Sequence, residues 1–338
     1  MKLYGGIDLH SNNSVVVIQD EEDRRQFEKR LRNDLPTILR ALAPFASELE
    51  GLVVESTYNW YWLVDGLMEA GYRVHLAHTA AIRTYAGLKH GDDFTDASWL
   101  AHLLRLGLLA EGYIYPKPER GLRDLLRKRG QLVRQRTTQL LSIQNQVLRT
   151  TAQRLSGNRI KQLTVEEVEG LLPEADVALA VTSNLAVMDC LMEQIRHLEG
   201  VVRRRMRPKP GFDHLCTVDG IGPILAWTIL LEVGDIGRFH RVGQFASYCR
   251  CVDAHRLSNG KKKGENNGKN GNRYLAWAFV EAAHFAVRYN PKIQRYYQRK
   301  KAKKNGAVAT KAVAHKLARA CYYILRENVP FDVDRAFA

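Results

Sequence analysis

The chain has 338 residues, of which 45% are hydrophobic and 26% are charged, a composition typical of a folded globular protein. Five cysteines without a CxxC pair argue against a disulfide scaffold and a zinc finger, and no uninterrupted apolar run reaches the ~18 residues of a membrane span. We therefore expect a reduced, cytoplasmic protein with no membrane segment and with two or three domains.

The net charge of +15 is distributed unevenly along the chain. Residues 1–115 hold 11 basic and 16 acidic side chains, whereas residues 206–338 hold 24 basic and 10 acidic ones. A strongly basic half indicates a polyanionic partner such as nucleic acid, because neutralised phosphates release their counterions. The acidic first third indicates that carboxylates have a separate use there.

In chain order, the first 110 residues alternate between expected strands and expected helices. Residues 3–9 and 14–19 predict a hairpin, because β-branched strands flank a turn of serine and asparagine. The later expected strands are 51–54 and 73–77, and the expected helices are 34–46, 61–70 and 94–110. This alternation predicts an α/β domain with a mixed sheet at residues 1–118.

A helical arm is predicted for residues 119–205. Apolar side chains recur there every seven residues, as in one helix of a coiled coil. The heptad positions are Leu126, Val133, Leu140 and Val147. A second apolar helix is expected at residues 177–202. The heptad pattern does not reveal whether the partner helix belongs to the same chain, so a helical hairpin and a dimerisation arm both stay open.

Residues 206–338 follow a basic, proline-bearing linker and predict a mainly helical domain. Residues 220–222 (Gly-Ile-Gly) separate two apolar helices, which is typical of a helix-hairpin-helix element that binds the phosphate backbone, or of a plain helix corner. Residues 258–272 predict a glycine-rich, lysine-rich loop that can approach phosphate closely. Ser258 in this loop is either a phosphate contact or an activated nucleophile, and spacing alone does not choose. The expected nucleic-acid-binding residues are Gly220, Gly222, Lys261, Lys262, Lys263, Lys269, Arg273, Lys300, Lys301, Lys303 and Lys304.

Four carboxylates in the first domain form a candidate metal site. Asp8 lies inside an apolar strand, where an unpaired ionised acid costs several kcal/mol. Glu55 ends another apolar strand, and Asp93 and Asp96 are i, i+3 neighbours at the start of a helix. Acids that converge from two strands and a helix can bind a hard cation such as Mg²⁺. Each acid also has a structural alternative, with Asp92 or Asp93 as the helix cap and Glu55 as a solvated strand end.

Several motifs together resemble the DEDD-type insertion-sequence transposases, the group described as bridge-RNA or seeker-RNA guided recombinases. The motifs are GIDLH, VVEST, DDFTDASWLA, GIGP and FASYCRCVDAHRLSNGKKKG with GNRYLAWAFVEAA, in this order over nearly the whole chain. The resemblance implies a RuvC-like, that is ribonuclease-H-like, N-terminal domain, a coiled-coil arm, and a C-terminal transposase domain with a helix-hairpin-helix-like element.

The resemblance also implies roles for individual residues. Asp8, Glu55, Asp93 and Asp96 correspond to an acidic tetrad that holds Mg²⁺, with the third acid uncertain between Asp92 and Asp93. Ser258 corresponds to a nucleophilic serine, although the family often shows paired serines and Leu257 precedes a single one here.

The implied function is an RNA-guided DNA recombinase that moves its own insertion sequence. The implied partners are donor and target DNA, a structured guide RNA, and further copies of the chain in a dimer or tetramer. Two alternatives remain at this point: a RuvC-like junction nuclease in which water attacks the phosphate, and a non-catalytic nucleic-acid-binding protein.

Overall fold

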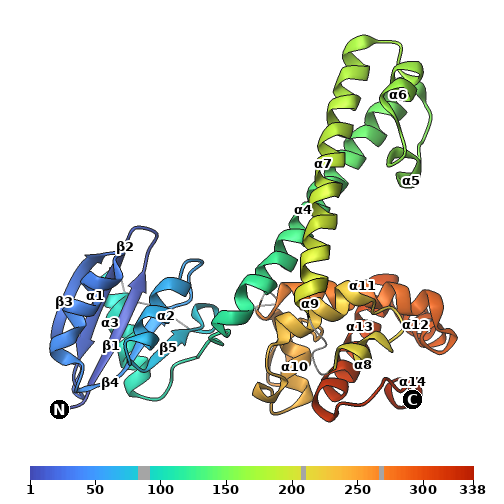
Figure 1. The fold of residues 1–338 in the computed structure, drawn as a ribbon. Helices are drawn as coiled ribbons and strands as arrows, with labels where there is room; N and C mark the ends of the chain where they lie inside the picture. The colour runs from blue at the N-terminus through green and yellow to red at the C-terminus, as the bar shows by residue number, and fades with distance from the viewer. Residues whose placement is uncertain (83–91, 207–210, 266–269) are drawn as a thin grey trace. The chain divides into compact units, whose positions relative to one another are not determined.

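The computed structural model describes residues 1–82, 92–206, 211–265 and 270–338 (Figure 1). The chain divides into two compact units, residues 1–117 and residues 118–338. The arm and the C-terminal helices, which the sequence analysis treats as separate domains at 119–205 and 206–338, both belong to the second unit. One residue expected to bind phosphate, Lys269, lies outside the described residues.

The first unit contains a five-stranded mixed sheet with the order β3-β2-β1-β4-β5. Its strands are β1 (Leu3–Leu9), β2 (Asn13–Gln19), β3 (Arg25–Arg32), β4 (Leu49–Glu55) and β5 (Val74–Ala77). β1 pairs antiparallel with β2 and parallel with β4, while β2 and β3 are antiparallel and β4 and β5 are parallel. The sheet therefore fits the ribonuclease-H-like α/β class that the sequence predicts.

Strand β3 is absent from the sequence-based prediction, which is wrong at this point. Its segment RQFEKRLR is mostly charged, and within it only Leu31 is buried. The strand forms because its backbone pairs with β2, from Asn13↔Arg32 to Gln19↔Arg25. Charged side chains are common on an edge strand, since they oppose pairing with other chains. An alternation of apolar side chains therefore could not reveal it.

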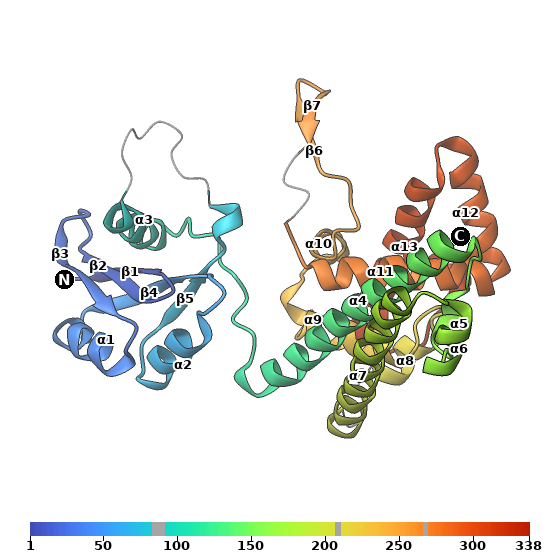
Figure 2. The ribbon, with the colours of Figure 1, turned by 90° about the horizontal axis from the view of Figure 1, so that it is seen from above.

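Helices cover both faces of this sheet (Figure 2). They are α1 (Leu35–Leu42) and α2 (Tyr61–Glu69) on one face and α3 (Asp93–Arg105) on the other. Side chains alternate along β1, so Ile7 and Leu9 join the core under α1 and α2, while Gly6 and Asp8 face α3. A Cβ atom at Gly6 would lie 1.9 Å from the carbonyl oxygen of Ala97 in α3. Glycine at this position therefore allows α3 to pack against β1 beside Asp8.

The arm of the second unit is a hairpin of two long helices (Figure 1). Its helices are α4 (Lys117–Thr151), α5 (Gly157–Ile160), α6 (Val165–Leu171) and α7 (Ala175–Arg205). Ile143 and Val147 of α4 share a buried cluster with Val181 and Leu185 of α7. The heptad pattern of α4 thus has a partner helix in the same chain.

Helix α7 has the length and the mean hydropathy, 1.4 over 18 residues, that a membrane-crossing helix requires. The sequence predicts no membrane segment, because no uninterrupted apolar run reaches the ~18 residues of a span, and this one helix does not contradict that prediction. Length and composition are weak evidence for a membrane span, since core helices of other proteins meet the same criterion. Asn184 of α7 donates a hydrogen bond to Ser142 of α4.

The C-terminal part of the second unit is a helical bundle with one small hairpin. Its elements are α8 (Phe212–Cys216), α9 (Pro223–Val233), α10 (Val242–Tyr248), β6 (His255–Ser258), β7 (Lys261–Glu265), α11 (Arg273–Tyr289), α12 (Pro291–Lys303), α13 (Gly306–Glu327) and α14 (Val333–Ala336). Phe245, Phe279, Leu317 and Cys321 are fully buried in its core. The expected loop at residues 258–272 is corrected in its first part, because β6 and β7 pair as an antiparallel hairpin.

Candidate metal centre and nucleic-acid interface

Two of the predicted acids lie at the carboxyl ends of adjacent parallel strands. The register Ile7↔Val54 between β1 and β4 places Asp8 next to Glu55. Asp8 is only 5% exposed, although its side chain is acidic. Burial raises the pKa of Glu55 to about 8, and a hydrogen bond to Asp8 and the charges of Asp8 and Asp96 act in the same direction. Glu55 therefore holds a proton at neutral pH when no cation is present.

Two neighbouring aspartates at the start of α3, Asp92 and Asp93, have different hydrogen-bond partners. Asp92 is the N-cap of α3, where its carboxylate accepts hydrogen bonds from the backbone nitrogen of Thr95 at 2.8 Å and from the Thr95 hydroxyl at 2.6 Å. Those hydrogen bonds lower the pKa of Asp92. Asp93 instead accepts a hydrogen bond from Arg30 at 2.5 Å, which is the main cause of its lowered pKa. The structure thus places Asp92 as the helix cap and turns Asp93 toward β1 and β3.

Asp96, one helical turn after Asp92, has a raised pKa. Desolvation is the largest cause, followed by the negative charges of Asp8, Asp93 and Asp92. Carboxylates that raise one another's pKa are close enough to repel, and repulsion of this kind is relieved by a bound cation. The four predicted acids therefore interact electrostatically on the α3 face of the sheet.

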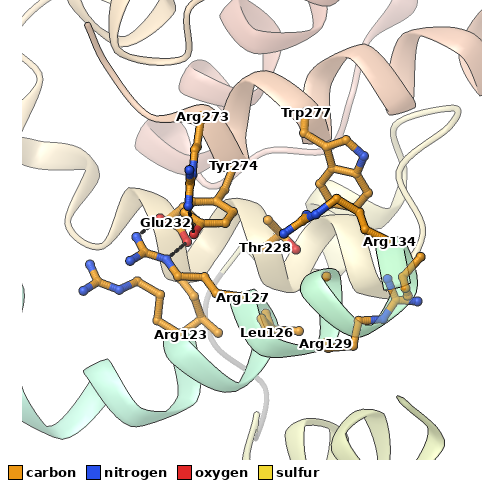
Figure 3. Close-up of a pocket in the computed structure, with 13 residues that line it drawn as sticks. Arg123, Leu126, Arg127, Arg129, Arg134, Thr228, Glu232, Arg273, Tyr274 and Trp277 are labelled. Atoms are coloured by element: carbon orange, nitrogen blue, oxygen red, sulfur yellow. Dashed lines mark hydrogen bonds and ion pairs between the residues drawn. The ribbon is translucent and has the colours of Figure 1, made fainter. Parts of the chain in front are cut away.

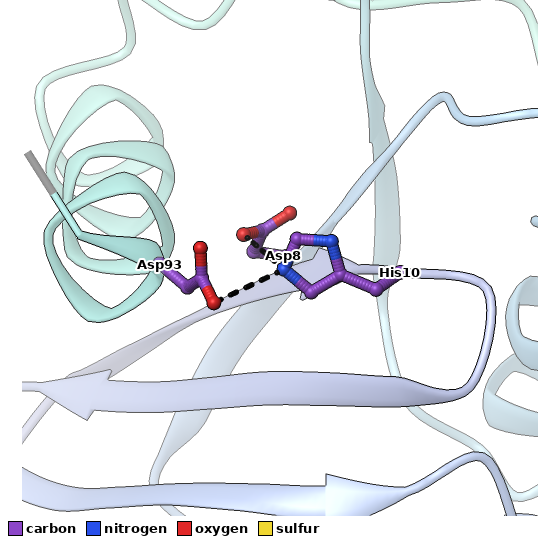
Figure 4. A group of neighbouring side chains, drawn as sticks. All are labelled: Asp8, His10 and Asp93. Carbon is purple, nitrogen blue, oxygen red and sulfur yellow. Dashed lines mark ion pairs between the residues drawn. The ribbon is translucent and has the colours of Figure 1, made fainter.

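His10 belongs to the same cluster, although it is not among the residues predicted from the sequence (Figure 4). Its Nε2 atom lies 3.2 Å from Oδ2 of Asp8 and 3.3 Å from Oδ2 of Asp93. Two amide groups, from Asn33 and Asn59, each donate a hydrogen bond of 3.0 Å to the His10 carbonyl and hold its backbone. The available signal was its position two residues after Asp8, because side chains at i and i+2 of an extended segment share one face.

The cluster fits a divalent metal ion. Among the described residues, ligand atoms of Asp8, His10 and Asp93 lie within 4.8 Å of one another. The Nε2 atom of His10 is buried and has no well-aligned hydrogen-bond partner, although both carboxylates are near it. Carboxylate oxygens are the ligands that hard cations prefer, and an imidazole nitrogen can join them.

The predicted nucleophile lies on the hairpin of the second unit. Ser258 ends β6, is exposed, and pairs with Lys261 of β7. The turn between them is Asn259-Gly260, in which both residues adopt the left-handed conformation, with φ of 48° and 70°. Asn-Gly is the strongest short hairpin signal, and the sequence analysis did not use it. Lys261, Lys262 and Lys263 are exposed along β7, so the hairpin presents one serine beside three cations.

The two glycines of the predicted phosphate-binding turn differ in their surroundings. Gly220 has φ of +89°, and a Cβ atom there would lie 2.4 Å from the carbonyl oxygen of Ala282 in α11. Packing therefore explains a glycine at this position. Gly222 caps α9 and faces open space, so its surroundings leave room for a ligand.

The remaining residues predicted to bind nucleic acid are exposed cations at helix ends. Arg273 begins α11, and the lysine run closes α12. That run comprises Lys300, Lys301, Lys303 and Lys304. The Nζ atom of Lys300 lies 5.5 Å from the ring centroid of Tyr296.

The mixed five-stranded sheet of the first unit fits a ribonuclease-H-like α/β fold. A model of DEDD-type IS110 transposases, described as "Transposase", matches residues 5–152, and one described as "Transposase IS116/IS110/IS902 family" matches residues 213–298. The chain belongs to the DEDD-type transposases of the IS110 family.

Two relatives are similar to the chain over part of its length. It is 24% identical over 183 residues to the "Insertion element IS110 uncharacterized 43.6 kDa protein" of Streptomyces coelicolor, which covers 52% of this chain and 45% of that protein. It is 24% identical over 233 residues to the "Probable family 20 transposase" of Pseudomonas aeruginosa, which covers 68% of each. The chain thus spans less than half the length of the first relative.

Proposed function

We propose that the chain cuts and rejoins DNA as the transposase of an insertion element, with Mg²⁺ as cofactor and a structured RNA as guide. The observation that carries this proposal is the group of ligand atoms of Asp8, His10 and Asp93, within 4.8 Å of one another. Glu55 and Asp96 support it, because burial and the nearby charge of Asp8 raise the pKa of both. Family membership supports the transposase activity and the DNA partner. The basic second unit supports a polyanionic partner, and the guide RNA is the partner that the resemblance implies.

Within this proposal the acids of the first unit hold the metal ion. Asp8, Glu55, Asp93 and Asp96 supply carboxylate oxygens, and His10 offers Nε2 as a further donor. When bound, the cation neutralises charge on the scissile phosphate and polarises its oxygens. Arg30 holds the Asp93 carboxylate in position, and Glu55 must release its proton before its oxygens can act as ligands.

Ser258 is the proposed nucleophile. Its Oγ gives up its proton and forms a bond to phosphorus while the bond from phosphorus to the leaving deoxyribose oxygen breaks, and that oxygen takes up a proton, so protons balance over the step. The resulting phosphoserine ester keeps the energy of the broken bond for rejoining. Lysines of β7 bind the neighbouring phosphates. An exposed hairpin is suited to this role, because duplex DNA cannot enter a buried site.

Activation of Ser258 requires a group from elsewhere in the assembly. Among the side chains that the structure describes, none is hydrogen-bonded to its Oγ. We propose that the carboxylate cluster of another copy acts on the same phosphate, within a dimer or tetramer in the cytoplasm.

A covalent adduct tests the proposal. A suicide DNA substrate with a nick beside the cleavage point releases the leaving strand, so the protein should stay attached to DNA in denaturing electrophoresis. Peptide mapping should place the adduct on the fragment with Ser258. Ser258→Ala should abolish the adduct while DNA binding is retained, and Ser183→Ala, at an exposed serine of α7, should leave the adduct yield unchanged.

Two other results would contradict the proposal. Cleavage by Ser258→Ala at the wild-type rate, with free phosphate ends, identifies water as the nucleophile and supports a junction nuclease. Salt-dependent binding with no cleavage under any divalent cation supports a non-catalytic binding protein.

A further inference from the structure

A cavity of about 380 Å³ lies inside the second unit, between α4, α9 and the start of α11 (Figure 3). None of its lining residues belongs to the carboxylate cluster or to the Ser258 hairpin. The residues that matter for its chemistry are Arg127, Arg134, Glu232, Arg273, Tyr274 and Trp277. Its volume lies within the range of small-molecule sites.

The floor of the cavity is a buried and fully paired carboxylate. Glu232 of α9 is 3% exposed and accepts two hydrogen bonds from Arg127 of α4, at 2.7 and 2.8 Å. A third hydrogen bond of 2.7 Å comes from the amide of Asn272, which also caps α11. This carboxylate therefore holds three helices in place, and its charge is already neutralised by protein groups.

The wall of the cavity carries cations that the protein does not neutralise. Arg129 is paired with Glu199 at 2.6 Å, but in the described part of the chain no carboxylate lies within ion-pair distance of Arg134 or Arg273. Arg273 donates a hydrogen bond of 2.9 Å to the hydroxyl of Tyr274, a neutral partner that leaves its charge in place. The cavity therefore favours an anion.

An aromatic side chain, Trp277, lies beside these cations. Trp277 lines the cavity and is 44% exposed, so its indole is accessible to a ligand. It follows Arg273 by four residues in α11, so both side chains lie on the same helix face. Figure 3 shows the indole extending from α11 toward α4. A flat apolar surface next to cations matches a nucleic-acid base joined to its phosphate.

We infer that this cavity binds one unstacked nucleotide of a single-stranded nucleic acid, with the base against Trp277 and the phosphates on its two sides facing Arg134 and Arg273, which lie at opposite ends of the cavity (Figure 3). A duplex is excluded as the ligand, because its base faces are covered by their neighbours. The inference rests on the proposed function only in that the chain acts on nucleic acid. It requires neither cleavage nor Ser258.

Binding of short homopolymers to the full chain tests the inference. The probes are fluorescein-labelled 12-mers of deoxythymidine and of uridine, and a 12-base-pair duplex, followed by anisotropy at several salt concentrations. Trp277→Leu should weaken binding of the single strands about tenfold, because stacking of a base on an aromatic ring contributes that much or more. The salt dependence of binding should be the same in Trp277→Leu as in the wild type, and Trp277→Phe should keep most of the wild-type affinity.

Substitution of the two arginines should change the salt dependence of binding, which substitution of Trp277 should not. The double variant Arg134→Gln, Arg273→Gln should weaken binding and also flatten the plot of log affinity against log salt by about 0.7 for each phosphate that the variant no longer neutralises. The matched controls are Tyr289→Leu, an exposed aromatic of α11 outside the cavity, and Arg149→Gln, an exposed arginine at the far end of α4. Each control should change the affinity less than twofold, and every variant should keep the wild-type melting temperature.

The comparison of probes decides the outcome. Preference for the deoxythymidine or the uridine strand identifies DNA or RNA as the source of the nucleotide. Unchanged single-strand affinity in Trp277→Leu, an equal loss in Tyr289→Leu, or an equal loss on the duplex overturns the inference. Failure of the proposed function is distinct, because it shows as missing DNA adducts with normal homopolymer binding.

Discussion

Two buried carboxylates, one in each unit, have opposite surroundings. Asp8 is 5% exposed and lies among other acids, and burial together with its charge raises the pKa values of Glu55 and Asp96. Glu232 is 3% exposed and is surrounded by donors from Arg127 and Asn272. A buried acid with protein cations as partners stabilises a fold, whereas a buried acid among acids needs a cation from outside. The comparison therefore separates a candidate metal centre from a structural ion pair.

The largest effect is expected at Asp8. Asp8→Asn keeps the shape of the side chain but removes one metal ligand, so cleavage with Mg²⁺ should fall about a thousandfold or more. In EDTA the same variant should melt slightly higher than the wild type, because repulsion between Asp8 and Asp96 is removed. Calorimetry and a cleavage assay measure the two changes. Asp189→Asn, at an exposed acid of α7, should change neither.

Loss of activity together with loss of stability would show that Asp8 is structural. Cleavage at the wild-type rate would exclude Asp8 from the metal site altogether. Either result removes the distinction between Asp8 and Glu232.

The next largest effect is expected for the ion pair of Arg127 and Glu232 in the second unit. Arg127→Met leaves the buried Glu232 carboxylate without its charged partner, which should lower the free energy of unfolding of the second unit by about 3 kcal/mol. Urea unfolding followed by circular dichroism measures the change. Arg129→Met is the matched control, since its partner Glu199 is 27% exposed and the loss should stay below about 1 kcal/mol. Equal losses in both variants would contradict the structural role of Glu232.

The smallest effect separates the two adjacent aspartates of α3. Asp93→Asn should reduce cleavage between about tenfold and a hundredfold, because Asp93 faces Asp8 and His10. Asp92→Asn should have little effect, since asparagine caps a helix as well as aspartate does. The cleavage rates of the two variants, measured at the same Mg²⁺ concentration, give the ranking. The reverse ranking would assign the third ligand to Asp92.

Much of the first unit could be predicted from local patterns. β1, β2, β4 and β5 have apolar or β-branched runs, and the helices between them have helical spacing. β3 could not be found in this way, because it is a charged edge strand. The β6–β7 hairpin also lacks apolar periodicity, since it contains lysines in place of apolar residues, and its local signal was the Asn259-Gly260 turn. Backbone pairing with a neighbouring strand, which leaves no periodicity in the side chains, defines both.

By itself, the sequence determined which acids were candidates, since an aspartate in an apolar strand stands out from its immediate neighbours and strand alternation is a local property. The tertiary structure determines which of these candidate acids lie close together. Packing of α3 on Gly6 turns Asp93 toward Asp8 and His10 and leaves Asp92 as the cap. The pair of Arg127 and Glu232 joins residues 105 positions apart, and no spacing rule reaches that far. Helix rotation and long-range packing depend on the whole core, so a local pattern cannot contain them.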